Sequence, residues 1–394
     1  MTRFDVIVSG AGVAGAASAL GLAQAGLQVA LIERQWPTDV HTPANTRVIA
    51  LAPASVRILQ RLGLWPLTAQ QAAAYTGMQV QARGQELRFD AAAVGEAALG
   101  WITDLDALQQ RCWDALPPKV RVMAPAKIVE VERLRGELRI ELDDGQRLRT
   151  RLLVVAEGAR SELREQLGFT LQQRDYGASG LVARVRTEQP NPGIAFQRFA
   201  AGGPLALLPL HDGSSSIVWT RPTVTAGQWQ QADRAELAAA LTVASAARFG
   251  AVLEVSAPTL FPLRMAIADR FVSERVALIG DSAHVVHPLA GLGLNLGMQD
   301  VAALIELVTK AHAIARDIGG VGTLSRYAAW REGDTRIAAG LIDGVERLFG
   351  AEPSRVQEAA ERGIAVVDAL PLLKRFFAMQ AAGLAGRVPE LARG

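Results

Sequence analysis

The chain opens with a hydrophobic pattern that predicts a strand, a tight turn, a helix and a second strand. Residues 4–9 are a short apolar run rich in β-branched side chains, and residues 10–15 contain three glycines. The next residues, up to 26, are rich in alanine, and residues 28–32 form a second apolar run. Apolar runs of these lengths, separated by glycine, predict a βαβ unit with two parallel strands.

Two further apolar runs end in similar turns. Residues 151–156 predict a buried strand that leads into Glu157, Gly158 and a helical pattern, and residues 275–279 predict another that leads into Asp281. Between these runs lie short strand-like segments separated by Gly, Pro and Asp, which predict a mostly antiparallel sheet. These segments are residues 178–186, 194–200, 205–210, 215–221 and 259–265.

The uncharged stretch at residues 6–32 could be mistaken for a membrane span or an export signal. Its five glycines and the polar Gln24 and Gln28 fit the βαβ unit better than a spanning helix. Cys112 is the only cysteine, so an internal disulfide is excluded and a reducing compartment fits. We therefore expect a cytoplasmic protein without a transmembrane segment, and we leave association with a membrane open.

Composition narrows the classes of partner and chemistry. The 41 basic and 39 acidic residues are dispersed and give a net charge of +2, so we expect no nucleic-acid partner. A length of 394 residues with 50% hydrophobic residues is typical of two joined domains. A single cysteine cannot form a redox pair, so any redox chemistry would use a bound cofactor. Asp281, His284 and His287 have a spacing that could be mistaken for a metal site, but we expect no metal there.

The first glycine-rich turn matches the GxGxxG pattern that binds a dinucleotide. Gly10 permits the tight turn, Gly12 lets a pyrophosphate approach the backbone, and Gly15 lets helix and strand pack closely. The helix that begins near Val13 then presents unpaired N–H groups to the phosphates. Glu33, at the end of the second strand, lies where a carboxylate accepts hydrogen bonds from the adenosine ribose. A glycine-rich packing turn is the plain alternative.

The two later turns resemble motifs of the group A flavin monooxygenases. Glu157 and Gly158 resemble the family's Asp-Gly motif, whose acid lies near the FAD pyrophosphate and helps the enzyme accept reduced nicotinamide; this chain has Glu where Asp is usual. Residues 280–300, GDSAHVVHPLAGLGLNLGMQD, closely resemble the form GDAAHxxHPxAGQGxNxGxxD of the flavin hydroxylases of ubiquinone biosynthesis. This branch is related to p-hydroxybenzoate hydroxylase. Ser282 and Leu292 depart from the family form, and Leu292 removes a polar group near the flavin.

The resemblance implies a set of FAD contacts. Asp281 would accept a hydrogen bond from a ribityl hydroxyl, and the following helix would point its N-terminus at the N1–C2 side of the ring. Residues 46–51 and 101–116 are similar to family segments that place Arg47 over the cofactor and Gln109 against the flavin, although a surface arginine and a half-exposed glutamine are plain alternatives. His284 and His287 are expected to be packing and capping residues. The expected contacts are Gly10, Gly12, Val13, Gly15, Glu33, Arg34, Arg47, Gln109, Glu157, Gly158, Asp281, Pro288, Gly291, Gly293, Leu294 and Asn295.

The resemblance also implies an α/β fold like that of p-hydroxybenzoate hydroxylase. A Rossmann-like FAD-binding domain would carry an inserted, mostly antiparallel β substrate domain and a C-terminal helical segment. We expect the FAD-binding domain at residues 1–71, 101–174 and 269–345, the substrate domain at 72–100 and 175–268, and the helical segment at 346–394. In that segment, residues 372–384 place apolar residues beside Lys374 and Arg375. This pattern suits contact with a membrane or a biosynthetic complex, and packing onto the enzyme itself stays open as the alternative.

The implied activity is aromatic hydroxylation. NADPH or NADH would reduce FAD, and one atom of O2 would then pass to a phenolic ring, either a small phenol or a prenylated ubiquinone precursor. The resemblance assigns no catalytic side chain, and the candidates beside the flavin ring are Pro288, Gly291 and Leu292. An FAD-linked reductase or dehydrogenase of an isoprenoid or quinone-like substrate, without oxygen insertion, is the alternative enzyme. A non-catalytic flavoprotein that scaffolds a complex is the third.

Overall fold

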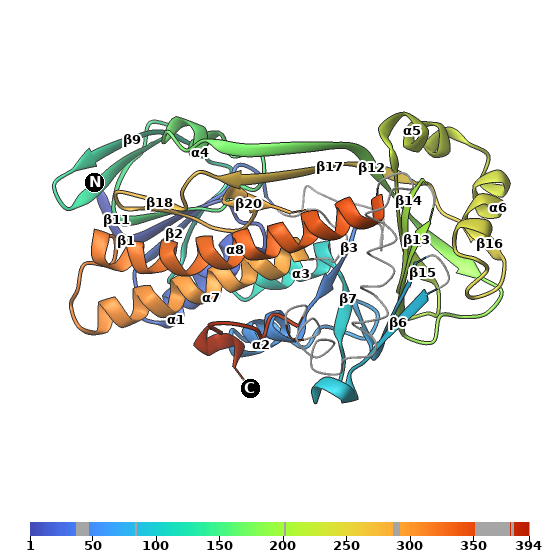
Figure 1. The fold of residues 1–394 in the computed structure, drawn as a ribbon. Coiled ribbons are helices and arrows are strands. Elements are labelled where there is room, and N and C mark those ends of the chain that lie inside the picture. Colours follow the sequence, from blue (N-terminus) through green and yellow to red (C-terminus); the bar gives the residue numbers. More distant parts are fainter. Residues whose placement is uncertain are drawn as a thin grey trace.

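Parallel strands form the centre of the larger part of the molecule (Figure 1). The computed structural model describes residues 1–36, 47–82, 85–200, 202–286, 292–350, 379 and 382–393. Its first sheet has eight strands. In spatial order they are β18 (Val272–Ser273), β19 (Val276–Leu278), β11 (Arg147–Val155), β1 (Thr2–Ser9), β2 (Val29–Ile32) and β8 (Arg121–Met123), with β10 (Glu137–Leu142) paired to β11 and β9 (Ile128–Leu134) paired to β10.

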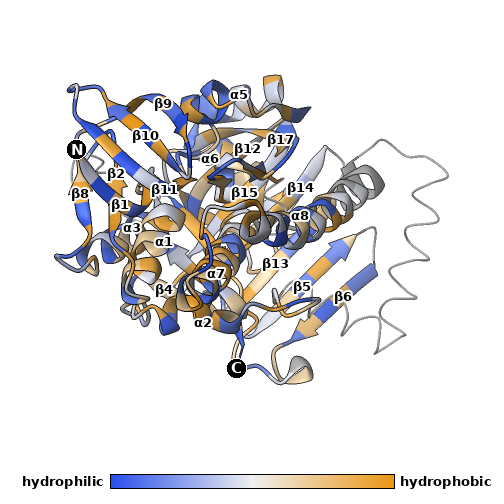
Figure 2. Cartoon of the chain, turned by 90° about the vertical axis from the view of Figure 1, so that its left-hand side faces the viewer, coloured by the Kyte–Doolittle hydropathy of each residue, from blue (hydrophilic) through white to orange (hydrophobic). Residues whose placement is uncertain are grey.

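The central strands of this sheet are parallel and buried. β1 pairs in parallel with β2 and β11, and β11 pairs in parallel with β19. Strands covered on both faces need continuous apolar runs, which explains sequences such as Val29–Ile32. Hydrophobic and hydrophilic residues alternate instead along β9 and β10, at the outside of the sheet (Figure 2).

Helices cover one face of this sheet, as Figure 1 shows. α1 packs against α3 and α7, and α7 packs against α8. A short helix, α4, follows β11. The bounds are α1 (Val13–Gln24), α3 (Leu105–Asp114), α4 (Glu162–Gln166), α7 (Leu292–Ala313) and α8 (Val321–Gly350).

The second sheet has nine strands and is mostly antiparallel, with β13 and β5 as a parallel pair. β12 is 17 residues long and, with β17, extends from beside the first sheet across to the other strands of the second sheet (Figure 1). Helices α5 (Thr223–Gln231) and α6 (Arg234–Ala244) lie on the outer side. The strands are β20 (His284–Val285), β17 (Thr259–Ala268), β12 (Leu171–Thr187), β15 (Ser215–Pro222), β14 (Gly203–Pro209), β13 (Ile194–Ala200), β5 (Gly77–Ala82) and β6 (Gln85–Asp90), with β16 (Val252–Val255) beside β12.

A small third sheet joins the two larger ones. It consists of β3 (Val48–Leu51), β7 (Gly100–Asp104) and β4 (Ala72–Tyr75), followed along the chain by α2 (Pro53–Arg61) after β3 and α3 after β7. β4 runs on into β5, and both β4 and the later part of α8 contact β14. The inner face of the nine-stranded sheet therefore turns toward β3, β7 and α8 (Figure 1).

The final residues return to the larger body. Ala382 O accepts a hydrogen bond from Ala54 N at 3.1 Å, and Gln299 Nε2 donates to Gly383 O at 3.2 Å. Leu384 packs against the main core. Within the predicted amphipathic stretch, Lys374 and Arg375 lie outside the described residues.

The expected α/β fold is confirmed, including the mostly antiparallel second sheet. The domain boundaries stay a prediction. Of the expected FAD contacts, Pro288 and Gly291 lie outside the described residues, as does His287. Among the helices that the structure describes, none combines the length and the apolar character that a membrane crossing requires.

Candidate FAD site

The three glycines of the first turn have different reasons to be glycine. A methyl group on Gly15 would lie 1.9 Å from Gly10 O, and one on Gly10, whose φ is +97°, would lie 2.4 Å from Ala156 O. These two glycines are therefore required by the packing of β1, α1 and β11. A methyl group on Gly12 would meet no atom of the described residues within 4 Å. The space beside Gly12 is open, as a bound pyrophosphate would require.

The N-terminus of α1 lies at this open space. Gly12 is the N-cap residue and provides no side chain to the first turn, which begins at Val13, so backbone N–H groups are left for a ligand. Glu33 follows β2, and its Oε2 accepts a hydrogen bond from Ala11 N at 2.6 Å. On the other side, Trp113 Nε1 donates to Ala11 O at 2.9 Å. The turn is thus held at Ala11 from two directions.

The turn at Glu157 and Gly158, the second motif, meets the glycine-rich turn of residues 10–15, the first motif, at the end of β1. Ser9 Oγ donates to Glu157 Oε1 at 2.6 Å, and Ser161 Oγ donates to Oε2 at 2.8 Å. Ser161 also caps α4 by accepting a hydrogen bond from Arg164 N. Glu157 therefore ties the carboxyl end of β1 to the start of α4. Gly158 follows with φ of +81°, and a methyl group added to it would meet no atom within 4 Å in the described part of the chain.

The third motif, residues 280–300, begins directly after β19, beside the second motif. Ser282 Oγ donates to Gly158 O at 3.2 Å. Asp281 lies in a single turn of 3-10 helix and its side chain is exposed, with no hydrogen bond to any residue that the structure describes. Surrounding protein raises the pKa of its carboxyl through desolvation, which His284 opposes and Asp300 reinforces. A carboxyl group without a partner among the described residues is suited to accept a hydrogen bond from a ligand hydroxyl.

A buried network fixes the backbone next to Asp281. Asp300 Oδ2 accepts from Gly280 N at 3.0 Å and lies 2.6 Å from His284 Nε2, while Oδ1 accepts from Arg331 Nε at 2.7 Å. Burial opposes ionisation of Asp300, but His284 and Arg331 outweigh it and hold the pKa of this carboxyl below its usual range. His284 is fully buried. It packs within the fold and orients Asp300, which agrees with the packing role expected from the sequence.

The start of α7 holds β3 in place. The side chain of Asn295 donates to Ala50 O at 2.8 Å and accepts from Ala52 N at 2.8 Å. Its amide therefore supports the strand that follows Arg47. Among the described residues, no atom lies within 4 Å of a methyl group placed on Gly293.

The other residues that were expected to contact FAD lie on several different elements around the three motifs. Arg47 is 46% exposed, with Nη1 3.9 Å from Asp106 Oδ1. Gln109 is half-buried on α3, Leu294 is half-buried on α7, and Arg34 is exposed after β2. No hydrogen bond within the described part of the chain singles out these residues, so their contacts with FAD stay predictions.

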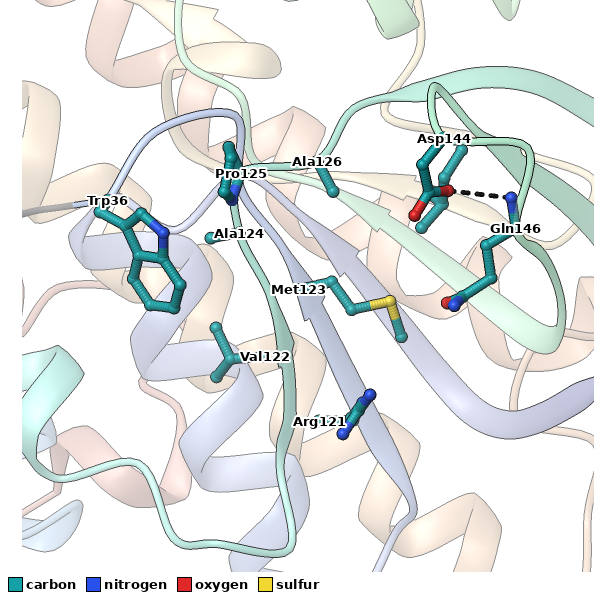
Figure 3. Close-up of a pocket in the computed structure, with 10 residues that line it drawn as sticks. Trp36, Arg121, Val122, Met123, Ala124, Pro125, Ala126, Asp144 and Gln146 are labelled. Atoms are coloured by element: carbon teal, nitrogen blue, oxygen red, sulfur yellow. Dashed lines mark hydrogen bonds between the residues drawn. The ribbon is translucent and has the colours of Figure 1, made fainter.

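A hollow of about 230 Å³ lies at the carboxyl end of β8 (Figure 3). Trp36 borders it on one side and Asp144 and Gln146 of the β10–β11 turn on the other, with Met123 between them. Since β8 lies at the opposite side of the sheet from β19, this hollow is remote from the third motif.

Together the motifs form one continuous line. The turns after β2, β1, β11 and β19 carry Glu33, Gly12, Glu157 and Asp281, and these four parallel strands are neighbours in the sheet. The carboxyl ends of parallel strands are where open α/β sheets bind ligands. Open backbone at Gly12 fits the pyrophosphate of a dinucleotide, and the carboxylate of Asp281, which has no partner among the described residues, fits a hydroxyl group of the adjoining chain. Among the described residues, no cluster of three potential metal ligands is present.

The sequence predicted the glycines and acids along this line, but it did not predict the residues that hydrogen-bond to them from distant parts of the chain. Trp113, Ser9 and Arg331 each contact a motif that is distant in sequence. Trp and Ser at these positions carry no local pattern that distinguishes them from ordinary core residues. Asp300 ends the third motif, so the resemblance gave a signal for it, but its partner on α8 could not be read from spacing.

The profile of the FAD binding domain family matches residues 3–333. The chain belongs to this family and is an FAD-dependent monooxygenase.

Two relatives match almost the whole chain. Ubiquinone hydroxylase UbiL of Rhodospirillum rubrum is 32% identical over 409 residues, covering 99% of this chain and 92% of that protein. The 3-demethoxyubiquinol 3-hydroxylase of Escherichia coli is 31% identical, covering 96% and 98%. Among solved structures, p-nitrophenol 4-monooxygenase PnpA of Pseudomonas putida DLL-E4 has the same fold, with a TM-score of 0.77 at 19% identity and coverage of 98% and 100%.

Gly12 and Gly15 give a matched pair of variants. Gly15→Ala forces backbone apart, so we expect a loss of about 1–3 kcal/mol in the free energy of unfolding and a fall in the apoprotein's Tm of roughly 2–8 °C. Gly12 has φ of −61°, which alanine adopts without strain, so Gly12→Ala should leave that Tm unchanged. Its affinity for FAD, measured by fluorescence titration, should fall by roughly tenfold or more, about 1.4 kcal/mol. Wild-type affinity in Gly12→Ala would mean that no ligand approaches this backbone.

Proposed function

We propose that this monooxygenase hydroxylates an electron-rich aromatic ring, using NADPH or NADH and O2, and that its substrate is a phenolic precursor of ubiquinone. The observation that carries the proposal is the near full-length similarity to two enzymes named as ubiquinone-pathway hydroxylases. Both predicted parts of the chain, the FAD-binding and the substrate side, lie within the aligned regions. The proposal therefore rests on more than the dinucleotide motif.

We propose that FAD lies along the line of turns described above. Gly12 and the N-terminus of α1 would bind its pyrophosphate, Glu33 its adenosine ribose, and Asp281 its ribityl chain. The flavin would supply the chemistry of oxygen activation when bound. Open space at Gly12 and the unpaired carboxyl of Asp281 support this assignment.

The protein's own task is to position the ring and exclude water. The nine-stranded sheet presents its inner face to β3, β7 and α8, and apolar residues dominate that face, as with Val80, Ala206 and Val218. An apolar wall of this kind suits an aromatic ring, and also a prenyl tail. Desolvation protects reactive intermediates from competing reactions with water.

Glu157 is our candidate for a role in nicotinamide use. Its carboxylate accepts hydrogen bonds from Ser9, Ser161 and Leu163 N, which fixes a negative charge where the first and second motifs meet. The side chain of Glu157 is one methylene group longer than that of the usual Asp, and these three donors hold its carboxylate in place. A fixed charge at this place is suited to orienting a reduced nicotinamide near the flavin.

A prenylated substrate would bring the enzyme to a membrane surface or into a biosynthetic complex. We propose a cytoplasmic protein with peripheral contact through the C-terminal segment, on the support of the amphipathic pattern at residues 372–384. Residues 382–393 pack onto α2 and α7, so they would anchor that segment to the body of the enzyme.

The function is tested by mixing the reduced nicotinamide anaerobically with the holoenzyme and a panel of phenols, with and without prenyl chains. We expect a phenol from the panel to accelerate flavin reduction, and addition of O2 to give a product heavier by one oxygen atom. Mass spectrometry of the product and stopped-flow absorbance of the flavin are the two measurements. Flavin reduction with no oxygenated product for any phenol would replace the hydroxylase with the reductase alternative.

Glu157→Ala tests the nicotinamide role, with Ser9→Ala as its control. Ser9→Ala removes one support of the carboxylate and leaves the charge in place. We expect Glu157→Ala to slow flavin reduction by roughly tenfold or more, about 1.4 kcal/mol, while its affinity for FAD changes less. Ser9→Ala should slow reduction only slightly. Equal effects of the two variants on the reduction rate would show that Glu157 serves only to tie β1 to α4.

A further inference from the structure

The two faces of the nine-stranded sheet are packed differently. On the outer face, one row of neighbouring residues crosses five strands and is buried throughout under the helices of this side; its members are Gln79, Phe196, Leu207, Ile217 and Ala183. Shifting each strand by one residue gives the corresponding row on the inner face, because side chains alternate. Its members are Val80, Gln197, Ala206, Val218 and Val182.

The inner row is only half covered. Val80, Ala206, Val218 and Val182 are all partly exposed, in contrast to their buried counterparts on the outer face. Gln197 is the one polar residue of the row, and it is only 7% exposed. Its immediate neighbours across β5 and β14 are Val80 and Ala206. An amide thus lies in the middle of an apolar wall.

The Gln197 amide has no hydrogen-bond partner among the residues that the structure describes. Gln79 differs in this respect: it has the same side chain on the adjacent strand, but its Oε1 accepts a hydrogen bond from Arg248 on the outer face. Although Gln197 is buried as a residue, its amide nitrogen and oxygen still reach the open side of the inner face. An amide that lies in an apolar wall and pairs with no described residue is placed to form a hydrogen bond with a ligand on this face.

We propose that Gln197 binds the substrate through a hydrogen bond to the hydroxyl group of its phenolic ring. An amide offers one acceptor and two donors, so it can accept from a neutral phenol or donate to its oxygen. The apolar residues on both sides would contact the ring itself. Gln197 would then set specificity, since a buried polar group rejects a ligand that leaves it unpaired. This inference rests on the proposed function and adds the residue that recognises the ring.

The test is a cycle of binding measurements on the FAD-loaded enzyme. The ligands are 2-farnesylphenol and farnesylbenzene, which differ by the hydroxyl group alone, and binding is followed by the change in the absorbance of bound FAD. The variants are Gln197→Met, with Gln197→Leu as a second apolar replacement, and Gln79→Met as the matched control on the outer face. The cycle isolates the interaction between residue 197 and the hydroxyl group.

We expect the wild-type enzyme to bind the phenol roughly tenfold more tightly than the hydrocarbon, and Gln197→Met to reduce this ratio to near one. A tenfold ratio corresponds to ~1.4 kcal/mol. Gln79→Met should keep the ratio, although it removes the partner of Arg248. The Tm of Gln197→Met without ligand should equal or exceed that of the wild type.

Three results would overturn the assignment of Gln197. The ratio could persist in Gln197→Met, which would mean that the amide faces only water. The affinity of Gln197→Met for both ligands could fall equally, or both apolar variants could fail to fold. Either result would mean that Gln197 has a structural role. Failure of the wild-type enzyme to bind either ligand is a different outcome, because it would remove the proposed phenolic substrate and the Gln197 assignment with it.

Discussion

The parallel pairing of β1 with β11 is the constraint on which the site depends. It places Ser9 beside Val155, so that the turns after these two strands, nearly 150 residues apart in sequence, leave the sheet side by side. The Ser9–Glu157 hydrogen bond then joins the first motif to the second, and Ser282 joins the second to the third. Gly10 has to be glycine because the backbone of Ala156 lies against it. Without this pairing, the three motifs would be separate turns with no common ligand.

Asp300 and Arg331, which hold the third motif in place, are buried on the side of the motif away from the open space. Asp300 binds the backbone of Gly280 and is neutralised by Arg331 from α8. Breaking a buried pair of this kind costs about 3–5 kcal/mol, because the remaining charge is left without a partner. The network therefore holds the start of the third motif rigidly, while Asp281 itself has no hydrogen-bond partner among the described residues. A site that is rigid behind and open in front is suited to binding a large cofactor in one orientation.

The sequence was informative wherever the chemistry depends on adjacent residues. Gly10, Gly12 and Gly15 act through their local spacing, so the pattern alone predicted the turn and the helix start. Contacts between distant segments could not be predicted, because spacing says nothing about which helix faces which strand. Arg331 reaches Asp300 from another helix, and the inward direction of Gln197 follows only from the register of β13 with its neighbours. Asn295 was expected beside FAD, and its side chain is engaged by the backbone of Ala50 and Ala52.

Isotope labelling shows whether this enzyme uses FAD to insert oxygen from O2 into an aromatic ring. The enzyme would turn over its phenolic substrate with NADPH under ¹⁸O2 in ordinary water, and the product would be analysed by mass spectrometry. We expect one ¹⁸O atom in the product of a flavin monooxygenase. An oxygen atom that comes from water, or a product with no added oxygen, would contradict it.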